Sequence, residues 1–484
     1  MHFIVKLFPE IIVKTPPVRK RMIKQLTNNL AKLLKPHSEE LRVVRDWDKI
    51  EVVGPQGNEV LQQRVCEILG NTPGIANFSL VHRYSLGDMQ QMYEQTLTHW
   101  REPLAGKTFC VRVKRNGTHP FTSNEVEQYV GGGLNQNTEA AGVKLKNPDV
   151  TVRLEIKEDN LYVIENTQPG LGGFPMGTQD SVISLISGGF DSNVASYLCM
   201  KRGLRTHFLF FNLGGRAHEL GVKEVAHFLW SKYGASHTVK FITVPFEGVV
   251  AEILEKVDNS QMGVTLKRMM LRAASQVASA LNVDAVVTGE AVAQVSSQTL
   301  VNLSVIDKVT DTLVLRPLIT TDKSDIIKTA REIGTEEFSA SMPEYCGVIS
   351  VKPTTRARME RIEREESRFD FSILDAAVTD RREELIHEVM EAVDADIDVE
   401  VLSVPLAESV ILDIRHPDEE ELSPLQVNGV AVKKIPFYQL AKKFAQLDGN
   451  TRYMLYCAKG IMSRLHAEIL FEQGHGNVAV YRPK

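Results

Sequence analysis

The hexapeptide Ser187-Gly188-Gly189-Phe190-Asp191-Ser192 lies between an apolar run at residues 182–186 and a segment of helical pattern at residues 193–199. The apolar run predicts a buried strand. A turn of small residues between a strand and a helix leaves backbone N–H groups free at the helix N-terminus, where they and the helix dipole attract phosphate. Gly188 and Gly189 let the backbone approach an anion closely. The hexapeptide therefore predicts a phosphate-binding loop, and a chance glycine turn is the alternative.

Length and composition place the chain among multidomain globular proteins. Its 484 residues are enough for roughly three or four domains, and its net charge is −5. No apolar run approaches the ~20 residues that span a membrane. The first ten residues lack the layout of a signal peptide. We therefore expect a cytoplasmic protein that does not contact a membrane.

The five cysteines are scattered along the chain, at Cys66, Cys110, Cys199, Cys346 and Cys457. They form no C-x-x-C pair, which argues against a zinc ribbon or a cysteine-ligated iron–sulfur site. The first three lie within helical or strand patterns, so we expect them in the core. A functional thiol must be recognised by its surroundings.

Alternating strand and helix patterns predict a multidomain α/β protein. From residue 181 to about 350, strands are expected at 208–212, 238–244, 285–289 and 313–318 with helices between them, which is typical of a doubly wound parallel sheet. Ligands of such sheets bind at the carboxyl ends of the strands. The expected domains span residues 1–60, 61–166, 178–393 and 399–484, with a Gly/Pro-rich connector at 167–177. Residues 356–393 are expected to form a charged helical extension.

Basic side chains recur on two predicted strands of the front half. Arg112 and Lys114 share one face of a strand at 108–115, and a strand at 143–146 repeats the pattern with Lys144 and Lys146. Such faces suit a phosphate backbone. A solvated strand face explains the pattern equally well.

The hexapeptide resembles the S-G-G-x-D-S signature of the PP-loop ATP pyrophosphatases, which cleave ATP to AMP and pyrophosphate. It is not the G-x-x-x-x-G-K-[ST] loop, because no Lys-Ser or Lys-Thr closes it. Ahead of it, residues 112–123 resemble a THUMP domain that follows a small ferredoxin-like domain. Behind it, residues 410–417 and 456–463 resemble two segments of the rhodanese fold. In this order the whole chain resembles the tRNA 4-thiouridine synthase family, which also serves thiamine biosynthesis.

The resemblance implies a function and its partners. It implies ATP- and Mg²⁺-dependent transfer of sulfur from a protein persulfide to uridine 8 of tRNA, through an adenylated uridine with release of AMP and pyrophosphate. It also implies transfer of sulfur to the thiamine sulfur-carrier protein, as a thiocarboxylate. The implied partners are tRNA, that carrier protein, a cysteine desulfurase as the persulfide donor and an external thiol reductant.

Two cysteines are expected to take part in sulfur transfer. Cys457 lies between a predicted strand and a predicted helix, where loop N–H groups and the helix dipole lower a thiol pKa and stabilise a persulfide. Met462 stands where the rhodanese loop often carries arginine, so a desulfurase fits better than thiosulfate as the donor. Cys346, in a Pro- and Gly-flanked segment, is equally compatible with packing and with chemistry. The resemblance implies that it is the redox partner of Cys457.

The nucleotide site is expected to combine the hexapeptide with more distant residues. Asp191 beside a polyphosphate adds repulsion unless Mg²⁺ or a lysine offsets its charge. Lys323 is the candidate lysine, and a surface lysine explains it equally well. By themselves, a solvated lysine, a helix-entry glycine and a loop amide would explain Lys267, Gly289 and Gln298 as well. The resemblance implies that the nucleotide-binding residues are Leu185, Ile186, Ser187, Gly188, Gly189, Asp191, Ser192, Lys267, Gly289 and Gln298, and that Asp191, Lys323, Cys346 and Cys457 are catalytic.

Two other classes of function remain open. A PP-loop adenylating enzyme that acts on a small molecule would explain the hexapeptide, but it would need neither the basic front domains nor Cys457. A non-catalytic RNA-binding or sulfur-carrier protein would explain both ends of the chain and leave the hexapeptide without a role.

Overall fold

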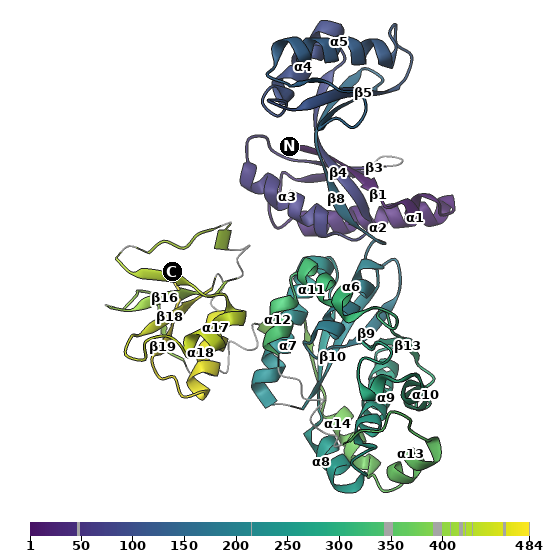
Figure 1. Cartoon of the computed structure of the whole chain (residues 1–484), viewed down its shortest axis with the longest axis vertical. Coiled ribbons are helices and arrows are strands. Elements are labelled where there is room, and N and C mark those ends of the chain that lie inside the picture. Colours follow the sequence, from purple (N-terminus) through teal and green to yellow (C-terminus); the bar gives the residue numbers. More distant parts are fainter. Residues whose placement is uncertain are drawn as a thin grey trace. The chain divides into compact units, whose positions relative to one another are not determined.

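The computed structural model describes residues 1–484 except 46–48, 214, 343–351, 391–398, 407, 416–419, 422, 428, 458–460 and 484. The chain divides into two compact units, whose elements are labelled in Figure 1. The first contains Met1–Thr178 and Lys201–Gly203, and the second contains Gln179–Met200 and Leu204–Lys484. Within the described ranges, no helix combines the length and the apolar character needed to cross a bilayer.

The described residues of the first unit form one eight-stranded sheet in the order β2-β3-β1-β4-β8-β7-β5-β6. The strands are β1 (His2–Leu7), β2 (Arg42–Arg45), β3 (Lys49–Val53), β4 (Ile75–Ser85), β5 (Thr108–Asn116), β6 (Gly142–Val143), β7 (Val150–Lys157) and β8 (Asn160–Gly172). The helices are α1 (Pro9–Ile12), α2 (Pro16–Leu34), α3 (Glu59–Asn71), α4 (Met89–Trp100) and α5 (Ser123–Asn137).

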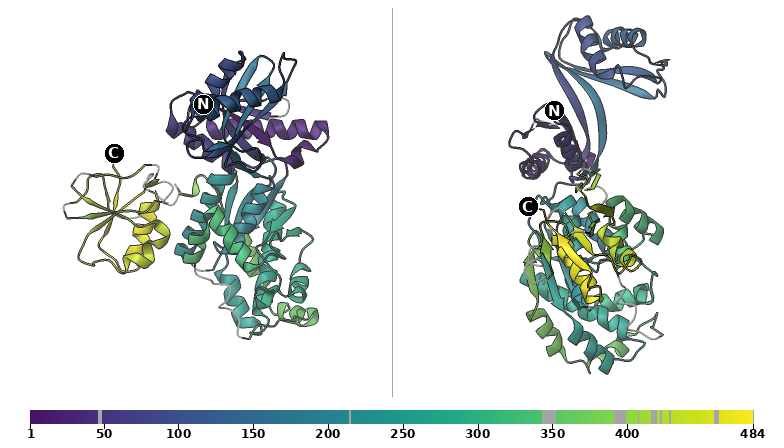
Figure 2. Two further views of the ribbon diagram at one scale, coloured as in Figure 1. Left: turned by 45° about the horizontal axis from the view of Figure 1, so that its top comes forward. Right: turned by 90° about the vertical axis from the view of Figure 1, so that its left-hand side faces the viewer.

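Strands β4 and β8 run through both halves of this unit and pair antiparallel from Ile75↔Gly172 to Ser85↔Asn160. At one end their side chains join a core beneath α2 and α3, and at the other end they join a core beneath α4 and α5. Figure 2 (right) shows them as two long strands between the two lobes of the unit. The two halves of the unit therefore share their central strands.

Local sequence accounts for the helices of this unit. In α2, Met22, Ile23, Leu26, Leu30 and Leu34 recur at helical spacing and are buried, as the periodicity predicts. Helices α4 and α5 each begin with a capping box, in which the cap side chain and the third helical residue bond to each other's backbone.

Three expectations about the first unit are wrong. Residues 167–172 of the expected connector are the end of β8, because β4 supplies a pairing partner that local composition does not reveal. The boundary expected at residue 60 is misplaced, since α3 begins at Glu59 and buries Leu61 and Val65 in the first core. Of the strand expected at 143–146, only Val143 is in β6.

The sheet that carries residues 187–192 lies in the second unit. Its described strands follow the order β13-β12-β9-β10-β11-β14. They are β9 (Ser181–Leu185), β10 (Arg205–Asn212), β11 (Lys240–Pro245), β12 (Ala285–Val287), β13 (Leu313–Leu315) and β14 (Arg382–Leu385). The pairs among the first five strands are parallel, as predicted. Strand β14 was not foreseen, and it pairs antiparallel with β11.

Helices surround this sheet. They are α6 (Phe190–Lys201), α7 (Gly215–Leu229), the π-helix η1 (Trp230–Gly234), α8 (Glu247–Lys256), α9 (Met262–Ala280), the 3₁₀ turn η2 (Ser296–Gln298), α10 (Leu300–Asp307), α11 (Lys323–Ile333), α12 (Glu336–Ser341), α13 (Met359–Glu366) and α14 (Phe371–Thr379). Among its described residues, the charged segment expected to be a helical bridge thus includes α13, α14 and the edge strand β14. A buried ion pair fixes it to α9, because Arg268 donates to both carboxylate oxygens of Glu366.

The C-terminal residues of the second unit form a separate parallel sheet. Its described strands follow the order β15-β19-β18-β16-β17. They are β15 (Val401–Leu402), β16 (Val410–Asp413), β17 (Ala431–Lys434), β18 (Tyr453–Tyr456) and β19 (Val478–Tyr481), and the helices are α17 (Phe437–Phe444) and α18 (Ile461–Glu472). Ile411, Met454 and Ala479 are fully buried in its core. This α/β arrangement agrees with the expectation for residues 399–484.

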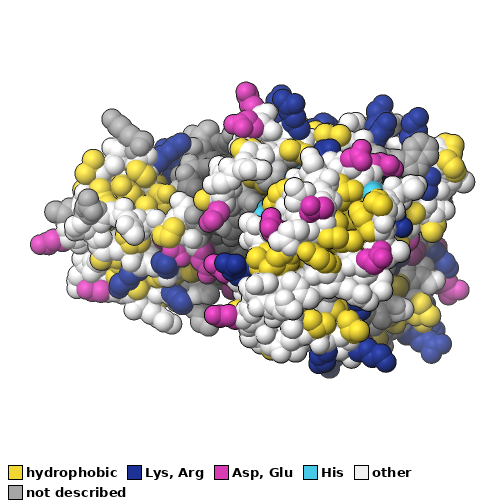
Figure 3. Space-filling view, turned by 90° about the horizontal axis from the view of Figure 1, so that it is seen from above, with side chains coloured by type: hydrophobic (Ala, Val, Ile, Leu, Met, Phe, Trp, Pro, Cys, Tyr) yellow, Lys and Arg dark blue, Asp and Glu magenta, His cyan; other side chains and the backbone are white. Residues whose placement is uncertain are grey.

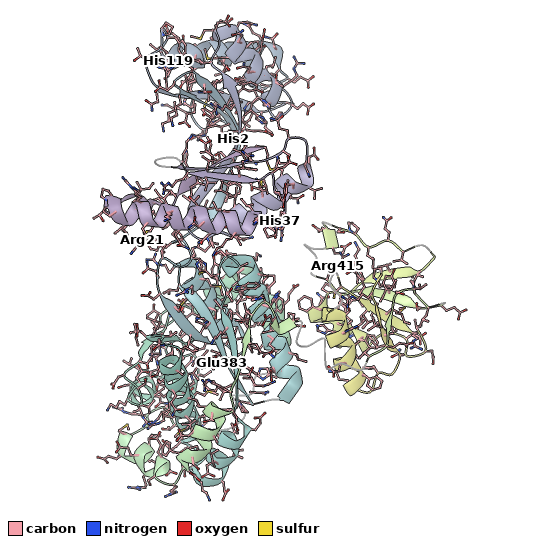
Figure 4. All side chains as sticks on the ribbon, turned by 180° about the vertical axis from the view of Figure 1, so that it is seen from behind. His2, Arg21, His37, His119, Glu383 and Arg415 are labelled. Atoms are coloured by element: carbon pink, nitrogen blue, oxygen red, sulfur yellow. The ribbon has the colours of Figure 1, made fainter. Side chains whose placement is uncertain are left out.

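One ion-pair cluster near the N-terminus allows the stability of the first unit to be tested against pH. The Glu51 carboxylate on β3 lies 3.0 Å from Nε2 of His2, which is labelled in Figure 4, and 2.8 Å from Nζ of Lys49. The hydrogen bond with His2 lowers the pKa of Glu51 from 4.5 to about 2, against the opposing effect of burial and with a further contribution from Lys49.

We predict that Glu51→Gln destabilises the first unit by about 1 kcal/mol at pH 7, after allowance for solvent screening of this partly exposed group. A depressed carboxyl pKa stabilises the fold above the unfolded pKa, so the difference from the parent shrinks as pH falls from about 4.5 to about 2. Hydrogen exchange of the β1 and β3 amides in the full chain measures this difference in stability. Glu39→Gln, at an exposed carboxylate, is the control. A difference that persists at pH 2 contradicts the assignment.

Candidate active site

Residues 187–192, here called the glycine loop, join the carboxyl end of β9 to the first turn of α6. Strand β9 lies between β10 and β12, so the loop emerges from the middle of the sheet. Gly188 has φ +79°, a left-handed conformation that favours glycine. Just before the loop, Ile186 is buried and its N–H bonds to the Leu209 carbonyl on β10. The sheet therefore fixes where the loop begins.

Hydrogen bonds within the loop hold its shape. The Ser192 hydroxyl accepts from the Ser187 N–H at 3.2 Å and donates to the Gly189 carbonyl at 3.2 Å. Asn193 Nδ2 donates to the Gly188 carbonyl at 2.9 Å and to the Ser339 hydroxyl at 3.0 Å. Because Ser192 and Asn193 satisfy backbone carbonyls of the loop, the loop is ordered by its own side chains. A preformed turn of this kind at a helix N-terminus can accept an anion.

Asp191 is held by two side chains from distant parts of the sequence. Lys323 Nζ, at the start of α11, lies 2.8 and 2.9 Å from the two carboxylate oxygens. Gln294 Nε2 donates to the same carboxylate at 2.8 Å. The structure therefore contains the charge offset that the sequence predicted for Lys323. The Lys323 side chain is 43% exposed, so this ion pair is accessible from solvent.

Gly289 packs directly against the start of α6. A Cβ added there would lie 2.5 Å from the Asp191 carbonyl carbon and 2.7 Å from the Ser192 nitrogen, closer than Cβ atoms normally approach other atoms. The residue follows β12, so this contact sets the distance between the ends of β12 and β9. The predicted site glycine thus has a steric role that any side chain would disturb.

Lys267 is engaged by an acid in this structure. Its Nζ lies 2.8 Å from Oε1 of Glu290, a buried carboxylate that also accepts from Arg316 Nε at 2.8 Å. Burial raises the pKa of Glu290, but Lys267 and Arg316 more than offset this and the pKa is lowered overall. Arg316 in turn pairs with Asp307. Glu290 thus remains paired with a cation if Lys267 turns away.

The remaining predicted nucleotide-binding residues line the neighbouring strand ends. Gln298 is in η2, and within the described residues its side-chain oxygen is buried without a hydrogen-bond partner. Leu185 is half-buried at the end of β9 and packs against the main core of the unit. Gln298 thus offers a free acceptor near the carboxyl edge of the sheet.

Cys457 stands at the end of β18, ahead of α18. The side chain is 7% exposed, and its sulfur accepts a hydrogen bond from the Ser463 N–H at 3.3 Å. This N–H belongs to the first turn of α18, so the thiol faces the positive end of the helix dipole, as predicted. Cys346 lies outside the described residues, and so does any contact between the two cysteines.

The other three cysteines are described. Cys110 and Cys199 are buried, as expected, and Cys66 is half-buried and packs against the first core. Cys66 lies on α3 within reach of the Gln168 side chain. Cys199 lies on α6, the helix that follows the glycine loop, whereas Cys66 and Cys110 belong to the first unit.

The basic strand face of the first unit is exposed and partly neutralised. Lys114 is 81% exposed and lies 3.9 Å from Glu155, while Arg112 lies 3.5 Å from Glu127. Lys144 and Lys146 are exposed as well. Figure 3 looks onto the other side of this half, where α4 and α5 lie, and there too Lys and Arg side chains stand among Asp and Glu. The face is open to a partner, but its charge is mixed.

Sequence reasoning missed four residues that shape the site. Gln294 holds Asp191, Glu290 holds Lys267, and Asn193 bonds to the loop backbone. His218 on α7 lies 3.4 Å from the Ser187 carbonyl. Gln294 and Glu290 follow β12, so the rule that ligands bind at the carboxyl ends of parallel strands would have singled them out. For Asn193 and His218 the sequence carries no comparable signal.

Comparison with known families matches three stretches of the chain. Residues 2–79 match the ThiI ferredoxin-like domain, residues 87–164 match the THUMP domain, and residues 177–371 match the family described as Thiamine biosynthesis protein (ThiI). The chain is 56% identical to a tRNA sulfurtransferase of Saccharophagus degradans over 483 residues. It is also 56% identical to a tRNA sulfurtransferase of Shewanella halifaxensis over 484 residues, and each match covers 100% of both chains.

Solved structures agree with the fold. The crystal structure of a 4-thiouridine synthetase–RNA complex with bound ATP is similar with a TM-score of 0.71 and 25% identity, and the match covers 79% of this chain and 99% of that one. A crystal structure from Pyrococcus horikoshii is similar with a TM-score of 0.53 and 19% identity over 69% of this chain and 100% of that one. The latter supports the fold alone.

We predict that Gly289→Ala displaces the start of α6, because the added methyl would lie 2.5 Å from the Asp191 backbone. Overpacking of this kind costs about 1–3 kcal/mol. Hydrogen-exchange mass spectrometry should show faster exchange of the glycine-loop amides. Gly248→Ala is the matched control, because its Cβ would meet Ile373 at an ordinary 3.5 Å. Unchanged loop exchange in Gly289→Ala would rule out the steric role.

Proposed function

The chain belongs to the ThiI family of tRNA sulfurtransferases, and on this premise we propose that it uses ATP to convert a tRNA uridine into 4-thiouridine. The observation that carries the proposal is the ordered glycine loop, whose acid Asp191 is already neutralised by Lys323. A phosphate-binding turn without that lysine would repel ATP. The similar synthetase was crystallised with RNA and ATP, which supports the same pair of substrates here.

Adenylation solves a leaving-group problem. The uracil O4 is a poor leaving group, so sulfur cannot displace it directly. In the proposed first step, O4 attacks the α-phosphorus of ATP, the bond to the β-phosphate breaks, and pyrophosphate departs. AMP, now bonded to C4 through the former O4, is a good leaving group. The chemistry therefore needs a site that holds pyrophosphate as its charge develops.

The glycine loop and nearby cations would provide that site. Backbone N–H groups at the start of α6 point to where the departing phosphates bind, and Lys323 keeps the Asp191 carboxylate from repelling them. Lys267 is the second cation, and we propose that it leaves Glu290 for the nucleotide while Arg316 keeps Glu290 neutralised. Gln298 offers its buried oxygen as a hydrogen-bond acceptor, and Leu185 and Ile186 offer backbone and apolar contacts.

Mg²⁺ fits this site only through the nucleotide. Both oxygens of Asp191 already bond to Lys323, and one also accepts from Gln294, so the carboxylate has little capacity left for a metal. We propose that the ion enters with the phosphate oxygens of ATP and its own waters. When bound, it supplies charge neutralisation for the leaving pyrophosphate.

The C-terminal sheet is proposed to be a rhodanese-like domain that carries sulfur. A desulfurase would load Cys457 as a persulfide, whose anion the Ser463 N–H and the dipole of α18 stabilise. The terminal sulfur attacks C4, AMP leaves with its bonding pair, and the Cys346 thiolate takes the inner sulfur as a Cys346–Cys457 disulfide. That step oxidises two thiols, so an external thiol reductant must reopen the disulfide before the next turnover.

The front domains and a second acceptor complete the proposal. The ferredoxin-like and THUMP domains would bind tRNA by its shape and its phosphates through the exposed basic strand face. We propose position 8 for the modified base, as the family resemblance implies. Transfer of persulfide sulfur to a thiamine sulfur-carrier protein, giving its thiocarboxylate, is a further proposed activity that rests on the ThiI family match. It would use Cys457 as the same sulfur source.

Dependence of ATP cleavage on tRNA tests the proposed function. We predict that pyrophosphate is released from labelled ATP only when tRNA is added, because the base supplies the attacking oxygen. Release at the same rate without tRNA would favour a small-molecule adenylating enzyme, and no release in any condition would favour a non-catalytic carrier. Asp191→Asn removes the carboxylate that positions Lys323 beside the loop, so it should lower the tRNA-dependent rate about 10²-fold. Lys328→Ala, exposed on the same helix as Lys323, should leave it unchanged.

Cys457→Ser tests the sulfur relay separately. The hydroxyl cannot form a persulfide, so we predict that 4-thiouridine disappears from cellular tRNA while tRNA binding and tRNA-dependent pyrophosphate release persist. Liquid chromatography of digested tRNA measures the nucleoside, and a filter assay measures binding. Cys66→Ser, at a half-buried thiol on α3 of the first unit, is the control. A normal amount of 4-thiouridine in tRNA from the Cys457 variant would contradict the proposed sulfur relay.

A further inference from the structure

A second group of chemically active side chains lies in the first unit, far from the glycine loop in sequence. His82 on β4, His99 on α4 and Glu165 on β8 each offer a ligand atom, and these atoms all lie within 4.8 Å of one another. His82 Nε2 is 2.7 Å from a Glu165 oxygen. The three residues come from three elements, so their convergence is a property of the fold. We call them the His–His–Glu cluster.

An irregularity in the sheet turns Glu165 toward the histidine. The register of β4 and β8 shifts between Leu80, which faces Asn166, and Val81, which faces Ile164. Glu165 is therefore the extra residue on β8, as in a bulge. Bulges often re-aim a side chain at functional sites.

The two histidine rings are stacked, with centroids 3.6 Å apart and planes 14° from parallel. Two imidazolium ions would repel each other at this distance, so the stack favours at least one neutral ring. Tyr84 Oη lies 2.6 Å from His99 Nε2 and fixes that ring. Hydrogen bonds of this kind commonly orient metal-binding histidines.

The cluster is partly open to solvent. The side chains of His82 and Glu165 are 30% and 39% exposed, so an ion can reach them from solvent.

We propose that His82, His99 and Glu165 bind one divalent transition-metal ion of the Zn²⁺ class, with a water in the fourth position. Two imidazoles and one carboxylate are the donor set that Zn²⁺ accepts and that Mg²⁺ and Ca²⁺ do not prefer. At zinc–ligand distances of about 2.0–2.1 Å, tetrahedral ligands lie roughly 3.3 Å apart. The ion would replace the proton that His82 and Glu165 now share, and that proton would pass to solvent.

Such an ion would fasten α4 to the two strands that both cores of the first unit share. Strands β4 and β8 contribute His82 and Glu165, and the last turn of α4 contributes His99. Because the ion would bind the folded unit and not the unfolded chain, it should stabilise this unit. This inference is independent of the proposed catalytic function.

Titration of the chelator-treated full chain with zinc chloride tests the proposal. We expect one site that is at least 10-fold weaker in Glu165→Gln and in His99→Asn, and zinc-dependent protection of β4 and α4 amides in the parent. Glu165→Gln keeps a hydrogen-bonding group beside His82 but removes the anionic ligand, so it separates metal binding from folding. His37→Asn, an exposed histidine labelled in Figure 4, is the control.

Zinc bound elsewhere can be told from zinc bound at the cluster. The cysteines are the same in all these variants, so zinc held by thiolates would bind them equally and leave the β4 and α4 amides unprotected. Equal affinity in the parent and both cluster variants would overturn the proposal. So would the absence of zinc-dependent protection in the parent, since the cluster would then be only a hydrogen-bonded group.

Discussion

The contact between the Asp191 carboxylate and Lys323 is the interaction on which the candidate active site depends. It joins the first turn of α6 to the start of α11, and Gln294 adds the loop after β12 to the same carboxylate. Gln294 and Lys323 lie 103 and 132 positions after Asp191, so these contacts fix three distant segments of the chain around one acid. Without the ammonium group, an acid at this position would oppose any polyphosphate bound to the loop.

The same arrangement of charges occurs a second time beside it. Glu290 is buried, yet it remains ionised because Lys267 and Arg316 both bond to it. Arg316 also pairs with Asp307, whose side chain is 42% exposed and can be stabilised by solvent. If Lys267 turned to an incoming anion, Glu290 would therefore keep Arg316 as its partner, and no buried charge would be left unpaired. This explains why Lys267 is engaged in the structure and is still suited to a nucleotide.

Much of the fold and of the candidate active site was predictable from local sequence, and the features that sequence reasoning missed have a common cause. The glycine loop and the placement of Cys457 before a helix follow from short patterns with direct physical meaning. Lys323 was only a candidate, because its sequence fits a surface lysine equally well. The connector at 167–177, the strand β14 and the role of Gln294 depend on partners that local sequence does not name. Pro169 and Gly170 signal a turn by composition, yet β4 holds them in a ladder. Gln294 has no local feature that separates it from a surface amide.

The central claim is that the glycine loop directs ATP to activate the uridine oxygen for displacement by sulfur. The most direct measurement starts from tRNA carrying ¹⁸O at C4 of the target uridine, followed by mass spectrometry of the products after a single turnover with ATP and a loaded persulfide. Attack of O4 on the α-phosphorus transfers the labelled oxygen to AMP, so the account predicts one ¹⁸O in AMP for each 4-thiouridine formed. Label found in water, or in inorganic phosphate with ADP as the product, would contradict it.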